Sequence, residues 1–157
     1  MFVAHSLGAG YAPLLANALP KSSVVYLCPA PVGPFDNVGA PLGSTREGFQ
    51  FPANREDGTS VWDPELAISA IYGRLPEEQA RMVASCLRPG ASPANAYPLT
   101  THPNVPTTFI YAEHDEFFEP DWSRWVARAV LGVEPLEIGT GHFPMVENPE
   151  LVARLLG

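Results

Sequence analysis

Three side chains that lie far apart in the sequence have the chemical types that nucleophilic catalysis needs. Ser6 lies in the segment Ala-His-Ser-Leu-Gly at residues 4–8, Asp115 follows Glu113 and His114, and His142 lies in a glycine-rich segment at residues 139–144. A serine hydroxyl is a weak nucleophile until a histidine removes its proton, and a carboxylate can fix the tautomer of that histidine and stabilise its charge. Ser6, His142 and Asp115 are therefore our candidate nucleophile, base and acid.

Ser6 lies where an apolar segment ends and a helical pattern begins. Residues 2–4 predict the end of a strand, and residues 7–19 predict a helix that Pro13 kinks and Pro20 ends. A small residue before the serine and a glycine after it permit a sharp turn that exposes the hydroxyl, with the Leu7 amide directed at developing negative charge. An ordinary strand–helix corner with a capping serine is the alternative.

The candidate acid and base each follow a predicted buried strand, at residues 107–112 and 135–138. Because sites in open α/β sheets form at the carboxyl ends of the strands, the three side chains are expected at one sheet edge. Two alternatives remain. The segment around Asp115 contains several acidic residues and could be a solvated turn, with Asp36 as the other candidate acid, and His142 could be a surface loop histidine.

The elements alternate in a way that predicts an α/β protein with a mostly parallel sheet of about four strands. A further buried strand is expected at residues 23–28, and core helices at 121–130 and 149–156. Between the strands at 23–28 and 107–112 lie a Pro- and Gly-rich loop at 32–58 and two predicted helices at 64–72 and 75–87. We interpret residues 33–104 as an inserted helical unit.

Composition excludes several functional classes. The net charge of −8 disfavours a nucleic acid or an anionic membrane as partner. The apolar runs are much shorter than the ~20 residues of a spanning helix. Two cysteines are too few for a disulfide scaffold, which favours a reducing, cytoplasmic compartment. A metal site formed by His102, His114 and Asp115 matches no common ligand spacing, so no metal is expected.

The same segments resemble the α/β-hydrolase family. Residues 4–8 resemble its nucleophile turn, residues 111–115 its acid segment, and residues 141–149 its histidine loop and closing helix. The segments Leu-Cys-Pro-Ala-Pro at 27–31 and Tyr-Pro-Leu-Thr at 97–100, with Leu-Arg-Pro between them, resemble a branch of small carboxylesterases and methyl-esterases.

This resemblance implies a serine hydrolase that needs no cofactor and acts on a small carboxylic ester through an acyl-enzyme. Residues 1–32 and 105–157 would form the hydrolase core, and residues 33–104 would form a cap over the active site. The Leu7 amide would supply one oxyanion contact.

The sequence departs from the family pattern before the nucleophile segment. Members usually carry further strands there and a His-Gly loop that donates a second oxyanion amide, and neither is present in this sequence. The first strand is then expected to form an exposed apolar edge through which the chain could self-associate. A truncated, catalytically inactive fragment and a hydroxynitrile-lyase-like enzyme with the same triad are the alternatives.

Overall fold

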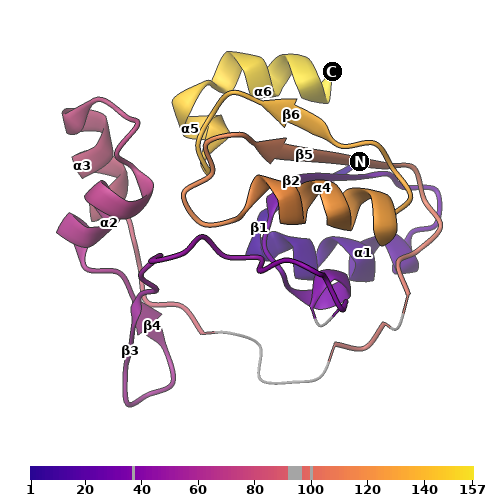
Figure 1. Cartoon of the computed structure of the whole chain (residues 1–157), viewed down its shortest axis with the longest axis horizontal. Helices are drawn as coiled ribbons and strands as arrows, with labels where there is room; N and C mark the ends of the chain where they lie inside the picture. The colour runs from indigo at the N-terminus through magenta and orange to yellow at the C-terminus, as the bar shows by residue number, and fades with distance from the viewer. Residues whose placement is uncertain (37, 92–96, 100) are drawn as a thin grey trace.

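A computed structural model describes residues 1–36, 38–91, 97–99 and 101–157 of the chain (Figure 1). The first half contains β1 (Phe2–Ser6), the 3₁₀ turn η1 (Leu7–Gly10), α1 (Ala12–Ala18), β2 (Val24–Pro29), the 3₁₀ turn η2 (Gly33–Phe35), β3 (Ala53–Asn54), β4 (Ser60–Val61) and α2 (Pro64–Ile71). The second half contains α3 (Glu77–Ser85), β5 (Thr107–Ala112), α4 (Pro120–Ala129), β6 (Leu136–Ile138), α5 (Pro144–Glu147) and α6 (Pro149–Leu156).

The main sheet confirms the predicted α/β architecture. Its strands follow the order β1-β2-β5-β6 and are all parallel (Figure 1). The register places Ala4 opposite Tyr26, Tyr26 opposite Phe109, and Ile110 opposite Leu136. Since all four strands run in the same direction, their carboxyl ends share one edge, and the loops that carry Ser6, Asp115 and His142 leave the sheet there.

Helices cover both faces of the sheet because alternate residues of its central strands point to opposite sides. On one face, Val24 and Tyr26 of β2 and Phe109 of β5 join a core cluster with the small residues of α1 and with Trp122 of α4. On the other face the cluster is formed with α6. Its buried members from the strands and α6 are Val25, Leu27, Cys28, Ile110, Ala112, Ile138 and Val152. Burial on both faces explains the uncharged sequence of β2 and the apolar residues 109–112 of β5.

The described elements from β3 to α3 form a separate group beside the sheet, whereas η2 packs on the core through Phe35. Figure 1 shows α2 and α3 next to one another, with the short β3–β4 hairpin below them. Asp63 caps α2, since its side chain accepts a hydrogen bond from the Leu66 amide (3.0 Å). Ala67 and Ile71 of α2 pack with Ala80 and Ala84 of α3 in an apolar cluster, against which Phe117 and Phe143 also pack.

The region after β1 differs from the prediction. A single kinked helix was expected over residues 7–19, whereas the structure has the turn η1, a break at Tyr11, and then α1. Pro13 lies in the first turn of α1, where a proline has no hydrogen bond to lose, so it helps begin the helix and does not kink it. The β3–β4 hairpin and the short helix α5 were not predicted.

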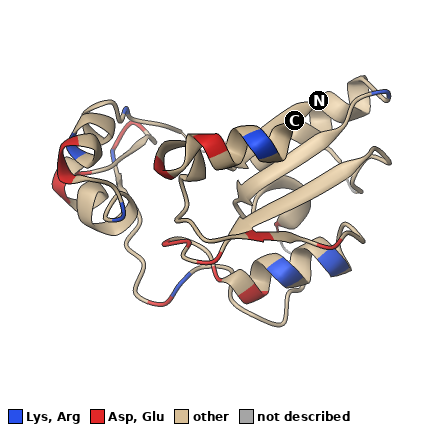
Figure 2. Cartoon of the chain, turned by 90° about the horizontal axis from the view of Figure 1, so that it is seen from above, with Lys and Arg blue, Asp and Glu red and all other residues tan. Residues whose placement is uncertain are grey.

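Charged residues lie on α2, α3, α4 and α6 and on the loops between elements, whereas β1, β2 and β5 contain none (Figure 2). In the described ranges no helix is long and apolar enough to cross a membrane.

Candidate active site

Ser6 ends β1 in a strained backbone conformation. Its φ of 50° and ψ of −121° lie in a region that residues other than glycine rarely adopt. The ladder between β1 and β2 shifts register between His5 and Ser6, and the Ala30 amide donates a hydrogen bond to the Ser6 carbonyl (3.1 Å). Such strain costs about 1–3 kcal/mol and is typical of functional sites. The strain lies at Ser6 itself. Gly8 was expected to let the turn form without a Cβ clash, but its φ is not positive and a Cβ there would lie 3.9 Å from the Ala4 Cβ, an ordinary contact.

The structure brings the three candidate side chains into one hydrogen-bonded chain. The Ser6 Oγ lies 2.9 Å from the His142 Nε2, and the His142 Nδ1 lies 2.8 Å from the Asp115 Oδ2. His142 is 1% exposed and Asp115 4% exposed. Because an ionised carboxylate can only accept, Nδ1 carries the proton and Nε2 is free to accept the proton of Ser6.

Asp115 is held in place by its own loop. Its Oδ1 accepts hydrogen bonds from the amides of Phe117 (2.8 Å) and Phe118 (3.0 Å), which leaves Oδ2 for His142. Asp36, the other candidate acid, is exposed at the end of η2. The geometry therefore pairs His142 with Asp115, and the surrounding acidic residues do not make this loop a solvated turn at that position.

His5 also contacts the catalytic histidine candidate, which the sequence did not reveal. Its Nε2–H donates to the His142 carbonyl (2.8 Å), and the two rings lie 4.9 Å apart. Burial, followed by repulsion from His142, lowers the pKa of His5 to about 4. His5 is thus a neutral donor at neutral pH. No local pattern could predict a contact between residues so far apart in the sequence.

Two carboxylates contact the backbone of the loop that carries His142. The Glu116 Oε2 accepts from the His142 amide (2.8 Å), and the Glu147 Oε2 accepts from the Gly141 amide (2.7 Å). Burial raises the pKa of the half-buried Glu116, and the hydrogen bond from His142 opposes that rise. In the sequence, Glu116 has only the pattern of a residue in an acidic turn.

Aromatic side chains surround the His142 ring. The ring centroids of Phe117, Phe143 and Phe118 lie 4.3, 5.0 and 5.3 Å from it. Phe117 in turn packs against Phe49 (4.4 Å) and Trp62 (6.0 Å) from the inserted segment. Apolar walls limit the access of water and strengthen the electrostatic interactions within the site.

The remaining candidates are Leu7, which lies next to the triad, and two histidines, whose side chains contact other groups. Leu7, whose amide was expected to bind an oxyanion, directly follows Ser6 and begins η1. His102 and His114 do not converge with Asp115 on a metal: His114 pairs with Glu113 (3.6 Å), and His102 contacts the Tyr26 hydroxyl (2.8 Å). Across the described residues, no group of histidine, cysteine and acidic side chains could hold a metal ion.

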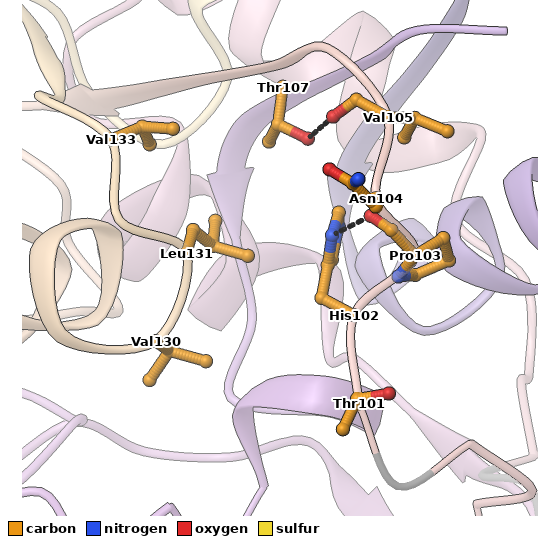
Figure 3. A pocket seen from close by; sticks show the side chains of 9 residues that line it. All are labelled: Thr101, His102, Pro103, Asn104, Val105, Thr107, Val130, Leu131 and Val133. Carbon is orange, nitrogen blue, oxygen red and sulfur yellow. Dashed lines mark hydrogen bonds between the residues drawn. The ribbon is translucent and has the colours of Figure 1, made fainter.

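His102 lies in a cavity of about 320 Å³ at the opposite, amino-terminal end of the strands (Figure 3). The lining side chains shown are Thr101, His102, Pro103, Asn104, Val105, Thr107, Val130, Leu131 and Val133. His102 uses both ring nitrogens within the protein, since Nδ1–H donates to the Pro103 carbonyl (2.8 Å) while Nε2 accepts from Tyr26. Because it lies at the other end of the strands, this cavity is separate from the triad.

A parallel α/β sheet with a serine, a histidine and an aspartate linked at its carboxyl edge defines the class of α/β hydrolases. A sequence profile of the alpha/beta hydrolase family matches residues 1–155, and the chain belongs to that family. A comparison with curated protein sequences found no match.

Solved structures share the fold at low sequence identity. Polyneuridine aldehyde esterase is 17% identical with a TM-score of 0.67, and an extracellular α/β-hydrolase from a Paenibacillus species is 18% identical with the same TM-score. Each match covers 98% of this chain and 69% of the other. A methylesterase from Arabidopsis is 18% identical with a TM-score of 0.63, over 98% of this chain and 66% of its own.

Proposed function

We propose that the chain is a serine hydrolase that cleaves small carboxylic esters through Ser6, His142 and Asp115. The observation that carries the proposal is the hydrogen-bonded chain from Ser6 Oγ through His142 to Asp115, with Ser6 held in a strained turn. Family membership supports hydrolysis as the reaction class, and the esterases among the similar structures support an ester as the substrate.

In the first half-reaction the Ser6 Oγ attacks the ester carbonyl while His142 Nε2 takes the hydroxyl proton. Asp115 stabilises the imidazolium that forms, and the Leu7 amide donates to the oxyanion. When the tetrahedral intermediate collapses, the bond to the alcohol breaks and His142 returns the proton to that leaving group. The acyl group is then bound to Ser6 as an ester.

In the second half-reaction a water molecule replaces the alcohol. His142 removes one of its protons as the oxygen attacks the acyl carbonyl, and collapse of the intermediate returns that proton to the Ser6 Oγ. The products are the carboxylic acid and the free enzyme. The residues of the chain supply every proton transfer, and the proposal includes no metal or organic cofactor.

Residues 33–104 are proposed as the cap over this site, and residues 1–32 with 105–157 as the core. Two contacts support the placement of this cap over the site: Phe49 of the inserted segment packs on Phe117 (4.4 Å), and Tyr72 packs on Phe143 (5.0 Å). The proposal also places the protein in the cytoplasm, for which the two free cysteines, Cys28 and Cys86, are the support.

Turnover of p-nitrophenyl acetate by the purified chain and by Ser6→Ala tests the proposed reaction. We expect hydrolysis by the wild type and loss of that activity in the variant, with unchanged circular dichroism. An aromatic cyanohydrin, assayed in parallel for release of cyanide, should not turn over. Cyanide release without ester hydrolysis would support a lyase in place of an esterase, and equal ester hydrolysis by Ser6→Ala would contradict the assignment.

A folded wild type that turns over neither substrate would support the alternative of an inactive fragment.

A further inference from the structure

The loop that carries His142 is fixed by polar groups from three different parts of the chain. Glu116, just after Asp115, holds the His142 amide, and Glu147 of α5 holds the Gly141 amide. His5 of β1 donates to the His142 carbonyl. The backbone on both sides of the His142 side chain therefore has specific partners, two of which are carboxylates.

Glu147 has a second partner that belongs to the inserted segment. The Arg74 Nε donates to the Glu147 Oε1 (3.0 Å), while the other oxygen of the same carboxylate accepts from Gly141. Arg74 lies between α2 and α3, so one carboxylate joins that helix pair to the histidine loop. The Glu147 side chain is 19% exposed and that of Arg74 is 40% exposed, which leaves the ion pair only partly screened by solvent.

Gly141 gives these groups room to approach the backbone. A Cβ at this position would lie 2.5 Å from the Glu116 Oε1 and 2.8 Å from the Arg74 Cδ. Any side chain at 141 would therefore push Glu116, Arg74 or both away from the loop.

A second contact joins the same two parts. The Phe143 ring, next to His142, lies 5.0 Å from Tyr72 at the end of α2 and 5.1 Å from His5. The residues on both sides of His142 thus contact, directly or through Glu147, the helix pair of the inserted segment.

We propose that Glu116 and Glu147 are positioning residues that hold His142 against Ser6, and that Arg74 makes this positioning depend on the placement of α2 and α3. The proposal rests on the proposed hydrolase function and deepens it. A charge-assisted hydrogen bond from a backbone amide to a carboxylate is stronger than one to a neutral acceptor, so each carboxylate restrains the loop. A shift of the loop would move Nε2 away from the Ser6 hydroxyl and reduce kcat.

The test compares alanine and glutamine variants at positions 116 and 147 in steady-state hydrolysis of p-nitrophenyl acetate. We expect Glu116→Ala and Glu147→Ala to lower kcat by about tenfold or more with little change in KM. Glu116→Gln should recover most of that loss, because its amide oxygen still accepts from the His142 amide. Glu150→Ala, which removes an exposed carboxylate from the first turn of α6, is the matched control and should behave as the wild type.

The ion pair with Arg74 is tested by a double-mutant cycle. Arg74→Met and Glu147→Gln each break the ion pair while leaving an oxygen that can accept from Gly141, so each should lower kcat by about threefold. The double variant should be no worse than either single variant. Losses that simply multiply would show that Arg74 and Glu147 act independently and would overturn the role given to Arg74.

Backbone hydrogen exchange gives a readout that does not depend on turnover. In the wild type the amides of Gly141 and His142 should exchange slowly, and Glu147→Ala and Glu116→Ala should speed the exchange at Gly141 and His142, respectively, by about tenfold. Unchanged exchange in both variants would overturn the positioning proposal even if the enzyme is active. If Ser6→Ala retains full activity, the proposed function fails, while the exchange rates still decide whether the carboxylates hold the loop.

Discussion

His5, a partly buried histidine next to the nucleophile, makes the stability of the fold depend on pH. His5 is neutral in the folded chain because burial lowers its pKa from 6.5 to about 4. An unfolded chain binds a proton at this position below about pH 6.5, while the folded chain does so only below about pH 4. Between these values the unfolded state binds more protons, so the contribution of His5 lowers stability as the pH falls.

The size of this effect follows from the two pKa values. At pH 7 the folded state is deprotonated at His5 and the unfolded state is only about one quarter protonated, so the cost to stability is only about 0.2 kcal/mol. At pH 5 the unfolded state is mostly protonated and the folded state is not, which costs about 2 kcal/mol. Lowering the pH from 7 to 5 should therefore remove about 2 kcal/mol of unfolding free energy through this residue alone.

Urea unfolding of the wild type and His5→Gln at pH 5 and pH 7, followed by tryptophan fluorescence, measures this contribution. Glutamine keeps an N–H group that can donate to the His142 carbonyl but does not titrate. Comparing the two proteins cancels the contributions of the other titratable groups to the pH dependence of stability. One of these is Glu116, whose raised pKa increases stability as the pH falls. The stability of the wild type relative to the variant should fall by about 2 kcal/mol at the lower pH. The same difference at both values would refute the account of His5.

Further substitutions test other parts of the structure. Asp115→Asn should lower kcat by about 10⁴-fold, because the amide would impose the wrong His142 tautomer; Asp36→Asn, which changes an exposed carboxylate, should leave the rate unchanged in the same assay. Ser6→Gly should unfold at a higher temperature than Ser6→Ala, since glycine relieves about 1 kcal/mol of strain at φ 50°. We also expect self-association through β1, an edge of the described sheet whose Val3 is 45% exposed. Val3→Lys should reduce the sedimentation coefficient at high protein concentration, whereas Leu42→Lys, at a similarly exposed residue elsewhere, should not.

The sheet could be predicted because its signals are local. The uncharged segments of β2 and β5, rich in β-branched residues, differ sharply from the Pro- and Gly-rich segments around them. Asp63 and Asn148 are N-cap residues that directly precede α2 and α6. Ser6, Asp115 and His142 each follow a predicted parallel strand, and this pattern predicted that the candidate triad lies at one edge of the sheet.

Other features depend on tertiary contacts that no local pattern encodes. The break at Tyr11 follows from the turn that η1 makes after the strained Ser6, and the period of apolar residues alone could not distinguish that turn from a helix. The partners of the histidine loop, Glu116 and Glu147, come from two separate segments, and their acidic side chains match the pattern of ordinary solvent-exposed residues. The bridge from Arg74 to Glu147 requires the placement of α2 and α3 relative to the core.

Labelling with a fluorophosphonate, followed by intact mass spectrometry, tests most directly whether Ser6 is an activated nucleophile. The wild type should gain a single adduct at neutral pH, because His142 lies 2.9 Å from the Ser6 hydroxyl and can accept its proton. Ser6→Ala should gain none, and His142→Ala should react far more slowly although its serine is intact. An adduct that persists in Ser6→Ala, or a folded wild type that gains none, would contradict the account.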